Sequence, residues 1–194
     1  MGSACTAAFA ILVAAAASAH AVETFGRAPS LGDAFAALAR TAAAVEVAPP
    51  EPESWFPIRG TIDFGEHDAR FGSWRGGHRH EGQDVFADPG TPLVAIRDGE
   101  VVETGDDGGR GNYVAIWSPE ADRTFVYLHM RAPTPLAVGE AVEGGARVGA
   151  VGCTGSCWGD HLHLEMRTGR GTTGTPLDPL PLLRRLALRA RGSS

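Results

Sequence analysis

Histidine spacing is the most informative feature of this chain. Of the seven histidines, four lie in two short motifs and at the end of one apolar run. In the first motif His80 stands four residues before Asp84. Imidazole and carboxylate are both good zinc ligands, but residues four apart on a straight strand have Cα atoms about 13 Å apart. The two side chains can share one metal ion only if the chain bends at Gly82 between them, and without that bend they form an ordinary surface pair.

A second motif places His161 and His163 two residues apart in a predicted strand. Alternate residues of a strand face the same side, with Cα atoms about 6–7 Å apart, so both imidazoles point into one space while Leu162 and Leu164 face the core. One imidazole could then bind a metal ion while the other reaches a water or substrate oxygen held by that ion. A pH-sensitive surface pair is the alternative. Glu165 continues the same face, where it either orients a metal ligand or is solvated.

His129 follows the apolar run 125–128 at the end of another predicted strand. Taken alone it is a structural residue. It becomes a candidate for catalysis because the other motifs predict a groove that needs a further polar group. His67 and His78 belong to no motif and are expected on the surface.

These motifs lie in a region of short apolar stretches separated by turn residues, which is the pattern of an all-β domain. The predicted strands are 92–96, 99–104, 113–117, 124–129, 147–151 and 161–167. We assign residues 55–181 to this domain. Residues 22–54 form an Ala-rich arm that ends in a Pro- and Glu-rich linker, with a short helix expected at 31–45. Residues 182–194 form a tail with a short amphipathic helix.

Length and charge restrict the function further. A chain of 194 residues suits one domain with short appendages, and a net charge of −6 makes nucleic acid and anionic membrane surfaces poor partners. Residues 1–21 contain an Ala-rich apolar run and end in Ala19-His20-Ala21, which predicts a signal peptide cleaved after Ala21. A retained anchor or a disordered start is the alternative, because this segment contains no Lys or Arg. Beyond it, no segment has the length of a transmembrane helix.

Signal cleavage would remove Cys5 and leave Cys153 and Cys157, which are separated by three residues. In an exported chain this spacing suggests a disulfide around a tight turn at Gly155. A metal-binding thiolate pair is the alternative, although zinc sites more often have a two-residue spacer.

Together, these stretches resemble the lysostaphin and LytM type of zinc metallopeptidase. The resemblance extends from Gly72 to about Pro179. Its marks, in chain order, are residues 80–85 (HEGQDV), 90–95 (GTPLVA), 98–101 (DGEV), 127–129 (YLH), 138–142 (VGEAV), 149–152 (GAVG), 155 (G) and 161–165 (HLHLE).

The resemblance implies an antiparallel β-sheet whose groove holds one zinc ion per chain. It implies His80, Asp84 and His163 as the zinc ligands, and His129 and His161 as the two catalytic histidines. It also implies a secreted or cell-envelope endopeptidase that cleaves peptide bonds of bacterial peptidoglycan with a zinc-activated water.

Two other classes of protein compete with this hypothesis. A catalytically silent relative could bind the cell wall or activate another hydrolase, but such a protein is expected to have lost ligands, and all five positions are filled here. Residues 139–145 also resemble lipoyl and biotinyl carrier hairpins, which need a modified Lys, and the chain contains none. Residues 22–54 could further act as a plug that covers the groove, with a glutamate reaching the metal.

Overall fold

The structure is a computed structural model, and it describes residues 53–192. The predicted signal peptide and the helix expected at 31–45 lie outside the described residues, as does nearly all of the arm with its proposed role as a plug. Within the described part the chain is mostly antiparallel β-sheet with one C-terminal helix, as predicted. Its elements are η1 (His67–Ala69), β1 (Gln83–Phe86), β2 (Pro92–Val94), β3 (Gly99–Asp107), β4 (Gly111–Ser118), β5 (Arg123–Met130), β6 (Ala141–Val142), β7 (Arg147–Ala150), β8 (His161–Thr168), β9 (Pro176–Leu177) and α3 (Leu180–Gly192).

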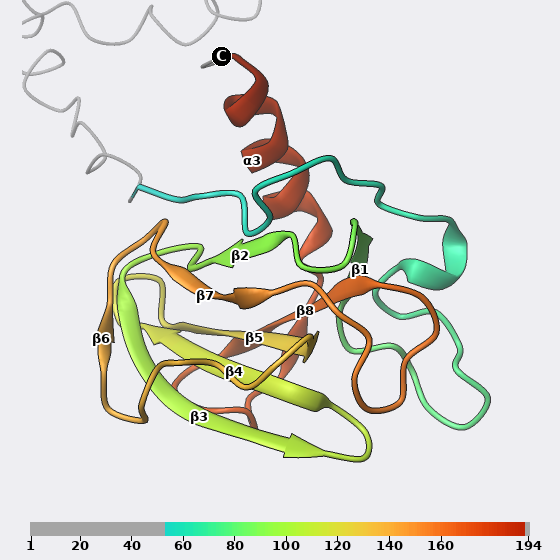
Figure 1. Cartoon of the computed structure of the whole chain (residues 1–194), viewed down its shortest axis with the longest axis horizontal. Helices are drawn as coiled ribbons and strands as arrows, with labels where there is room; N and C mark the ends of the chain where they lie inside the picture. The colour runs from blue at the N-terminus through green and yellow to red at the C-terminus, as the bar shows by residue number, and fades with distance from the viewer. Residues whose placement is uncertain (1–52, 193–194) are drawn as a thin grey trace, which may run out of the picture. The chain divides into compact units, whose positions relative to one another are not determined.

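One seven-stranded sheet dominates the described chain. Its strands run in the order β1-β8-β5-β4-β3-β6, and β9 pairs with β8. A separate two-stranded sheet, formed by β2 and β7, lies above this sheet in the view of Figure 1. The pairings are antiparallel throughout, and hairpin turns connect β3 with β4 and β4 with β5.

The six predicted strands all exist, and their ends differ from the prediction by at most three residues. Gly, Asp and Pro turn residues bound these strands, which is why their positions could be predicted. Strands β1, β6 and β9 were not predicted. Two of them contain only two residues, which is too few for an alternating pattern, and β1 contains four.

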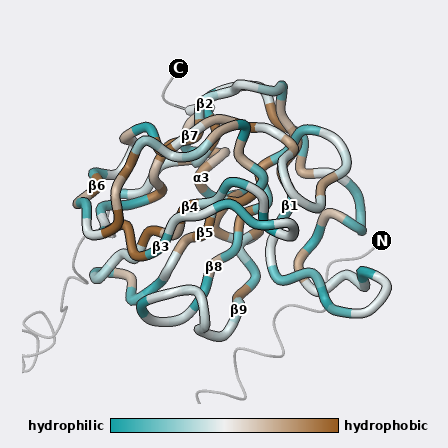
Figure 2. Tube along the Cα trace, turned by 60° about the horizontal axis from the view of Figure 1, so that its bottom comes forward, coloured by the Kyte–Doolittle hydropathy of each residue, from teal (hydrophilic) through white to brown (hydrophobic). Residues whose placement is uncertain are grey.

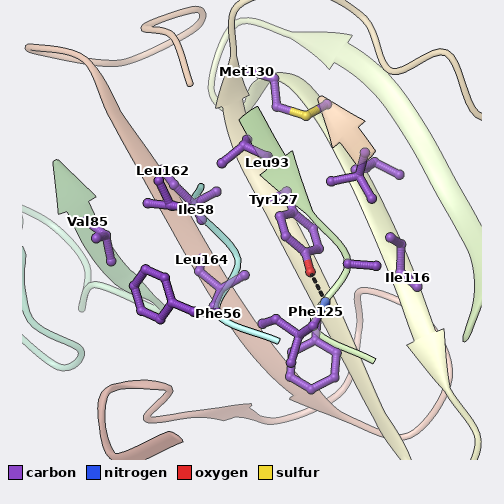
Figure 3. Close-up of a cluster of buried hydrophobic side chains, with 14 of the residues drawn as sticks. Phe56, Ile58, Val85, Leu93, Ile116, Phe125, Tyr127, Met130, Leu162 and Leu164 are labelled. Carbon is purple, nitrogen blue, oxygen red and sulfur yellow. Dashed lines mark hydrogen bonds between the residues drawn. The ribbon is translucent and has the colours of Figure 1, made fainter. Parts of the chain in front are cut away.

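The main core covers one face of the large sheet. Leu162 and Leu164 of β8 are fully buried in it, as predicted, together with side chains from β1, β4 and β5. Figure 3 shows these side chains packed against Phe56 and Ile58, which precede the sheet in the chain. Figure 2 shows hydrophobic residues along the central strands and hydrophilic residues along much of the outer loops.

The opposite face of the large sheet carries a smaller apolar cluster of Tyr113, Ala115, Val126 and Leu128. The residues of β8 that alternate with the core leucines also belong to this side. The sheet thus separates the main core from a second surface, on which polar groups can gather without disturbing the core.

The C-terminal helix α3 is part of the packed unit. It begins at Leu180, and its Leu183 and Leu186 are buried in the main core. Its arginines Arg184, Arg185 and Arg189 are exposed, as predicted for a solvated face. Across residues 53–192, no helix is both long enough and apolar enough to cross a membrane.

A buried tyrosine hydroxyl links the two sheets of the fold. Tyr127 is completely buried, and its hydroxyl accepts a 2.9 Å hydrogen bond from the backbone N–H of Ile96, which follows β2 (Figure 3).

We expect Tyr127→Phe to lower the free energy of unfolding by about 1–3 kcal/mol, because the buried N–H of Ile96 loses its acceptor. Urea unfolding of the two chains, compared under the same conditions, measures this loss.

Tyr113→Phe is the matched control. The Tyr113 hydroxyl donates to the half-exposed carboxylate of Glu103, which water can solvate, so its loss should cost less than about 1 kcal/mol. Equal losses in the two variants would contradict a special role for the Tyr127 hydrogen bond.

Candidate metal centre

Three neighbouring strands supply most of the polar cluster. Strand β8 lies between β1 and β5, and its His163 is the direct partner of Asp84 on β1 and of Leu128 on β5. Direct partners in an antiparallel pair point to the same face, so Asp84 and His163 meet on the side away from the main core.

His80 reaches the same cluster from outside the sheet. It precedes β1, and the chain bends at Gly82, as the four-residue spacing required. A Cβ at Gly82 would lie 2.5 Å from the Leu164 carbonyl oxygen and 2.6 Å from His163 Nε2. Only glycine therefore lets the backbone pass this close to the histidine ring.

The donor atoms of three residues converge on one point. His80 Nε2 lies 3.1 Å from Asp84 Oδ1, His163 Nδ1 lies 2.9 Å from the same oxygen, and the two nitrogens are 2.9 Å apart. In a tetrahedral zinc site with bonds of about 2.0–2.1 Å, ligand atoms are about 3.3 Å apart. The three residues, all buried, therefore fit a metal ion after shifts of a few tenths of an ångström.

Partners of the second ring nitrogens orient both imidazoles. His80 Nδ1 lies 2.9 Å from the carbonyl oxygen of Arg70, which can only accept, so this nitrogen carries the proton and Nε2 keeps its lone pair. His163 Nε2 faces Glu165 Oε1 at 3.4 Å, which leaves its Nδ1 for a metal. Glu165 thus contacts the imidazole from behind, as an orienting carboxylate would.

Arg75 is bound to the other oxygen of the carboxylate. Its Nη2 donates to Asp84 Oδ2 at 2.5 Å and to the Asp68 carbonyl oxygen at 2.7 Å. Because Oδ2 is engaged, Oδ1 is the oxygen that Asp84 presents to a metal. The guanidinium also offsets part of the cost of burying this carboxylate.

His129 lies at a β-bulge inside β5, one residue before the strand ends. The register of β4 and β5 shifts between Asn112 and Val114, so two residues of β5, Leu128 and His129, oppose the single residue Tyr113. His129 has a φ of 60° and its N–H donates to the Arg110 carbonyl. Without the extra residue, His129 would point into the main core, and the bulge turns it toward the polar face.

The bulge brings His129 beside two of the other histidines of the cluster, His161 and His163. Its ring centroid lies 5.0 Å from that of His161 and 5.8 Å from that of His163. In both His129 and His161, Nδ1 is 2.8 Å from a backbone carbonyl oxygen, that of Thr154 and that of Gly159 respectively. Both rings therefore carry the lone pair on Nε2, which in His161 lies 3.5 Å from Asp84 Oδ1.

The environment shifts the pKa values of these groups in a consistent way. Burial alone would raise the pKa of Asp84, but hydrogen bonds with His163 and His80 hold it well below its usual range. Burial would lower the pKa of His163, yet its hydrogen bonds to Asp84 and Glu165 raise it, so a metal must compete with a proton there. Burial lowers the pKa of His129 to about 4 and also lowers that of His161, so both are neutral bases near pH 7.

The cluster lines a cavity of about 500 Å³. The exposed Trp158 and Ser156 lie on one wall, and Gly109, from the hairpin between β3 and β4, also borders it. His78 is exposed at the same cavity, while His67 is exposed and faces Asp68. Within the loop that carries Trp158, the sulfur atoms of Cys153 and Cys157 are within bonding distance, and their Cα atoms are 5.3 Å apart.

All five site residues expected from the sequence lie in this one cluster. Arg75 and Thr154 were not expected to take part. Neither stands in a motif: Arg75 lies nine residues before Asp84, and only the backbone of Thr154 contacts His129.

Comparison with known proteins decides the family. The sequence profile of peptidase family M23 matches residues 78–179, more than half of the chain and the whole of the cluster except Arg75. The chain belongs to peptidase family M23.

Relatives within the M23 family are similar over the same region. Glycyl-glycine endopeptidase ALE-1 of Staphylococcus capitis is 34% identical over 109 residues, which are 56% of this chain and 30% of that protein. DD-carboxypeptidase/endopeptidase Mpg of Neisseria meningitidis serogroup B is 39% identical over 108 residues, 56% of this chain and 23% of that protein. The chain thus spans less than a third of the length of these relatives.

A solved structure of the M23 family shares the fold. The catalytic domain of lysostaphin from Staphylococcus simulans superposes with a TM-score of 0.55 at 28% identity, over 64% of this chain and 92% of that domain.

The close approach at Gly82 generates a prediction. In Gly82→Ala the new methyl group would displace the His163 ring or separate β1 from β8. We expect the affinity for zinc to fall about tenfold or more, measured by competition with a chromogenic chelator. Gly77→Ala is the control, because a Cβ there meets nothing within 4 Å. Equal affinities in Gly82→Ala and Gly77→Ala would show that the glycine is not required.

Proposed function

We propose that this chain is a zinc metalloendopeptidase that hydrolyses peptide bonds in bacterial peptidoglycan. One observation carries the proposal: His80 Nε2, Asp84 Oδ1 and His163 Nδ1 lie within 3.1 Å of one another, beside two further histidines that are both held through Nδ1 by backbone carbonyls. Three protein ligands leave one position open, as in catalytic rather than structural zinc sites. A relative named peptidoglycan DD-endopeptidase ShyC, from Vibrio cholerae serotype O1 and 38% identical over 88 residues, supports the substrate class.

We assign the metal to His80, Asp84 and His163. Two neutral imidazoles and one carboxylate suit zinc well. When bound, zinc supplies a Lewis acid and makes a coordinated water acidic enough to ionise near neutral pH. Arg75 holds the unused carboxylate oxygen, and Glu165 holds the back of His163.

His129 and His161 carry the proton transfers in this proposal. Each ring is neutral near pH 7 and presents Nε2 to the cavity, so each can accept a proton from the attacking water. The protonated ring can then donate to the oxyanion or to the leaving amine.

We also propose that the chain is exported and acts in the cell envelope. The predicted signal peptide and a disulfide between Cys153 and Cys157 both suit an oxidising compartment. The substrate itself lies outside the cytoplasm.

The test measures turbidity loss and fragment release from purified sacculi. We expect zinc to restore cleavage after chelation and His163→Ala to abolish both metal binding and cleavage. His129→Ala should bind zinc but lower the rate by about 10²–10⁴-fold, which is the usual contribution of general acid and base catalysis. His67→Ala, on an exposed surface, is the control and should retain full activity.

The released fragments identify the bond that is cut. If the chain binds one zinc ion tightly but releases nothing from sacculi, the proposal of peptidoglycan hydrolysis is wrong. A silent binding module or a different substrate would then be the better explanation.

A further inference from the structure

One short loop contacts both histidines to which we assign proton transfer. Residues 153–160 make up most of the connection from β7 to β8. The residues on either side of this loop, Gly152 and His161, form an isolated β-bridge, so the two ends of the loop lie side by side. The His161 N–H donates to the Gly152 carbonyl at 3.2 Å. The two cysteines lie within this loop, four residues apart.

Two carbonyl groups of this loop determine how the rings are protonated. The Thr154 carbonyl oxygen accepts from His129 Nδ1 and the Gly159 carbonyl oxygen accepts from His161 Nδ1, each at 2.8 Å. A carbonyl oxygen cannot donate, so both rings must carry the proton on Nδ1. The loop thereby selects the tautomer in which Nε2 is unprotonated in both histidines.

The first half of the loop is anchored to the sheet independently of the cysteines. Thr154 Oγ1 donates to the Met130 carbonyl at 2.8 Å and accepts from the Asn112 N–H at 2.9 Å. Gly111 packs against it so closely that an added Cβ would lie 2.4 Å from the Thr154 carbonyl carbon. The Thr154 carbonyl, and with it His129, is therefore held by β4 and β5.

The second half of the loop is exposed. Ser156, Trp158 and Gly159 are all solvent-exposed, and Trp158 retains 68% of its accessible surface. The Ser156 N–H donates to the Gly109 carbonyl. The next residue, Cys157, is bonded to Cys153, and Gly159 follows two residues later.

We propose that the Cys153–Cys157 bond is a positioning element for His161. It ties the exposed half of the loop to the anchored half and thereby holds the Gly159 carbonyl that orients the His161 ring. The inference rests on the proposed function for the catalytic meaning of His161, but its geometric content is independent of activity. It predicts an unequal effect: loss of the bond disturbs His161 and spares His129.

The test uses ¹⁵N-histidine NMR of the zinc-loaded chain, which distinguishes the two ring nitrogens of each histidine and so reports the tautomer. Spectra are recorded well above the ordinary histidine pKa. We expect His161 to change from a single Nδ1–H tautomer to a mixture in the Cys153→Ala/Cys157→Ala double variant, with His129 unchanged; alanine is used because Cys157 Sγ lies 3.7 Å from His161 Nδ1, where a serine hydroxyl could itself donate to the ring. Thr154→Val, which removes the anchoring hydroxyl but keeps the cysteines, should change His129 and spare His161.

Several results would overturn the proposal. An unchanged His161 signal in the double variant would do so, as would equal changes at His129 and His161, which indicate general loosening. Free thiols on both cysteines in the exported protein would do so as well. If the double variant does not fold, the same spectra of the reduced wild-type chain decide the question without a substitution.

Activity supplies a second readout on soluble peptidoglycan fragments. We expect kcat of the double variant to fall about tenfold, the size of effect typical of residues that orient a catalytic group, with KM changed less than about twofold. If the wild-type chain cuts no peptidoglycan, the proposed function fails, and the NMR comparison still decides whether the cysteine bond positions His161.

Discussion

Asp84 and His163 are direct partners in the β1–β8 ladder, and the remainder of the site is arranged around that pairing. A shift of one residue in this register would turn Asp84 toward the main core and expose Val85 on the polar face. Apolar packing of the fully buried Val85, Leu162 and Leu164 therefore fixes the register of β1 against β8. This register in turn determines where Asp84 and His163 lie. Gly82 is part of the same constraint, because the chain must pass the His163 ring without a side chain before it can deliver His80.

The large sheet keeps stability and chemistry on opposite faces. Along β8, leucines alternate with polar residues, so one strand contributes both to the core and to the site. His129 is an exception, because the alternation along β5 would point its side chain into the main core. A single extra residue at the β4–β5 bulge moves it to the polar face, at the cost of a left-handed backbone conformation.

Features that depend on residues close together in the chain could be predicted from the sequence, whereas contacts between distant segments could not. The positions of six strands could be predicted from the turn residues between them. The two-residue period of a strand predicted that His161 and His163 lie on one face and Leu162 on the other. The spacing of His80 and Asp84 required a bend, which the structure has at Gly82. However, no local rule joins these residues to a strand 79 positions later, and that connection came only from the family resemblance. Arg75 and Thr154 act through tertiary contacts and a backbone carbonyl, for which residue type carries no signal.

The rim of the cavity comes from segments that contribute nothing to the main core. The buried core residues of the described chain lie in the strands, in α3 and in the connections beside them, whereas 70–80, 107–110 and 153–160 supply none of them. At the exposed positions of these three segments, substitutions therefore carry little folding penalty as long as Arg75, His80 and Thr154 keep their contacts. Natural selection can alter the shape of the entrance through them while the scaffold and the donor atoms stay the same, which makes substrate range the property of this protein most open to evolutionary change.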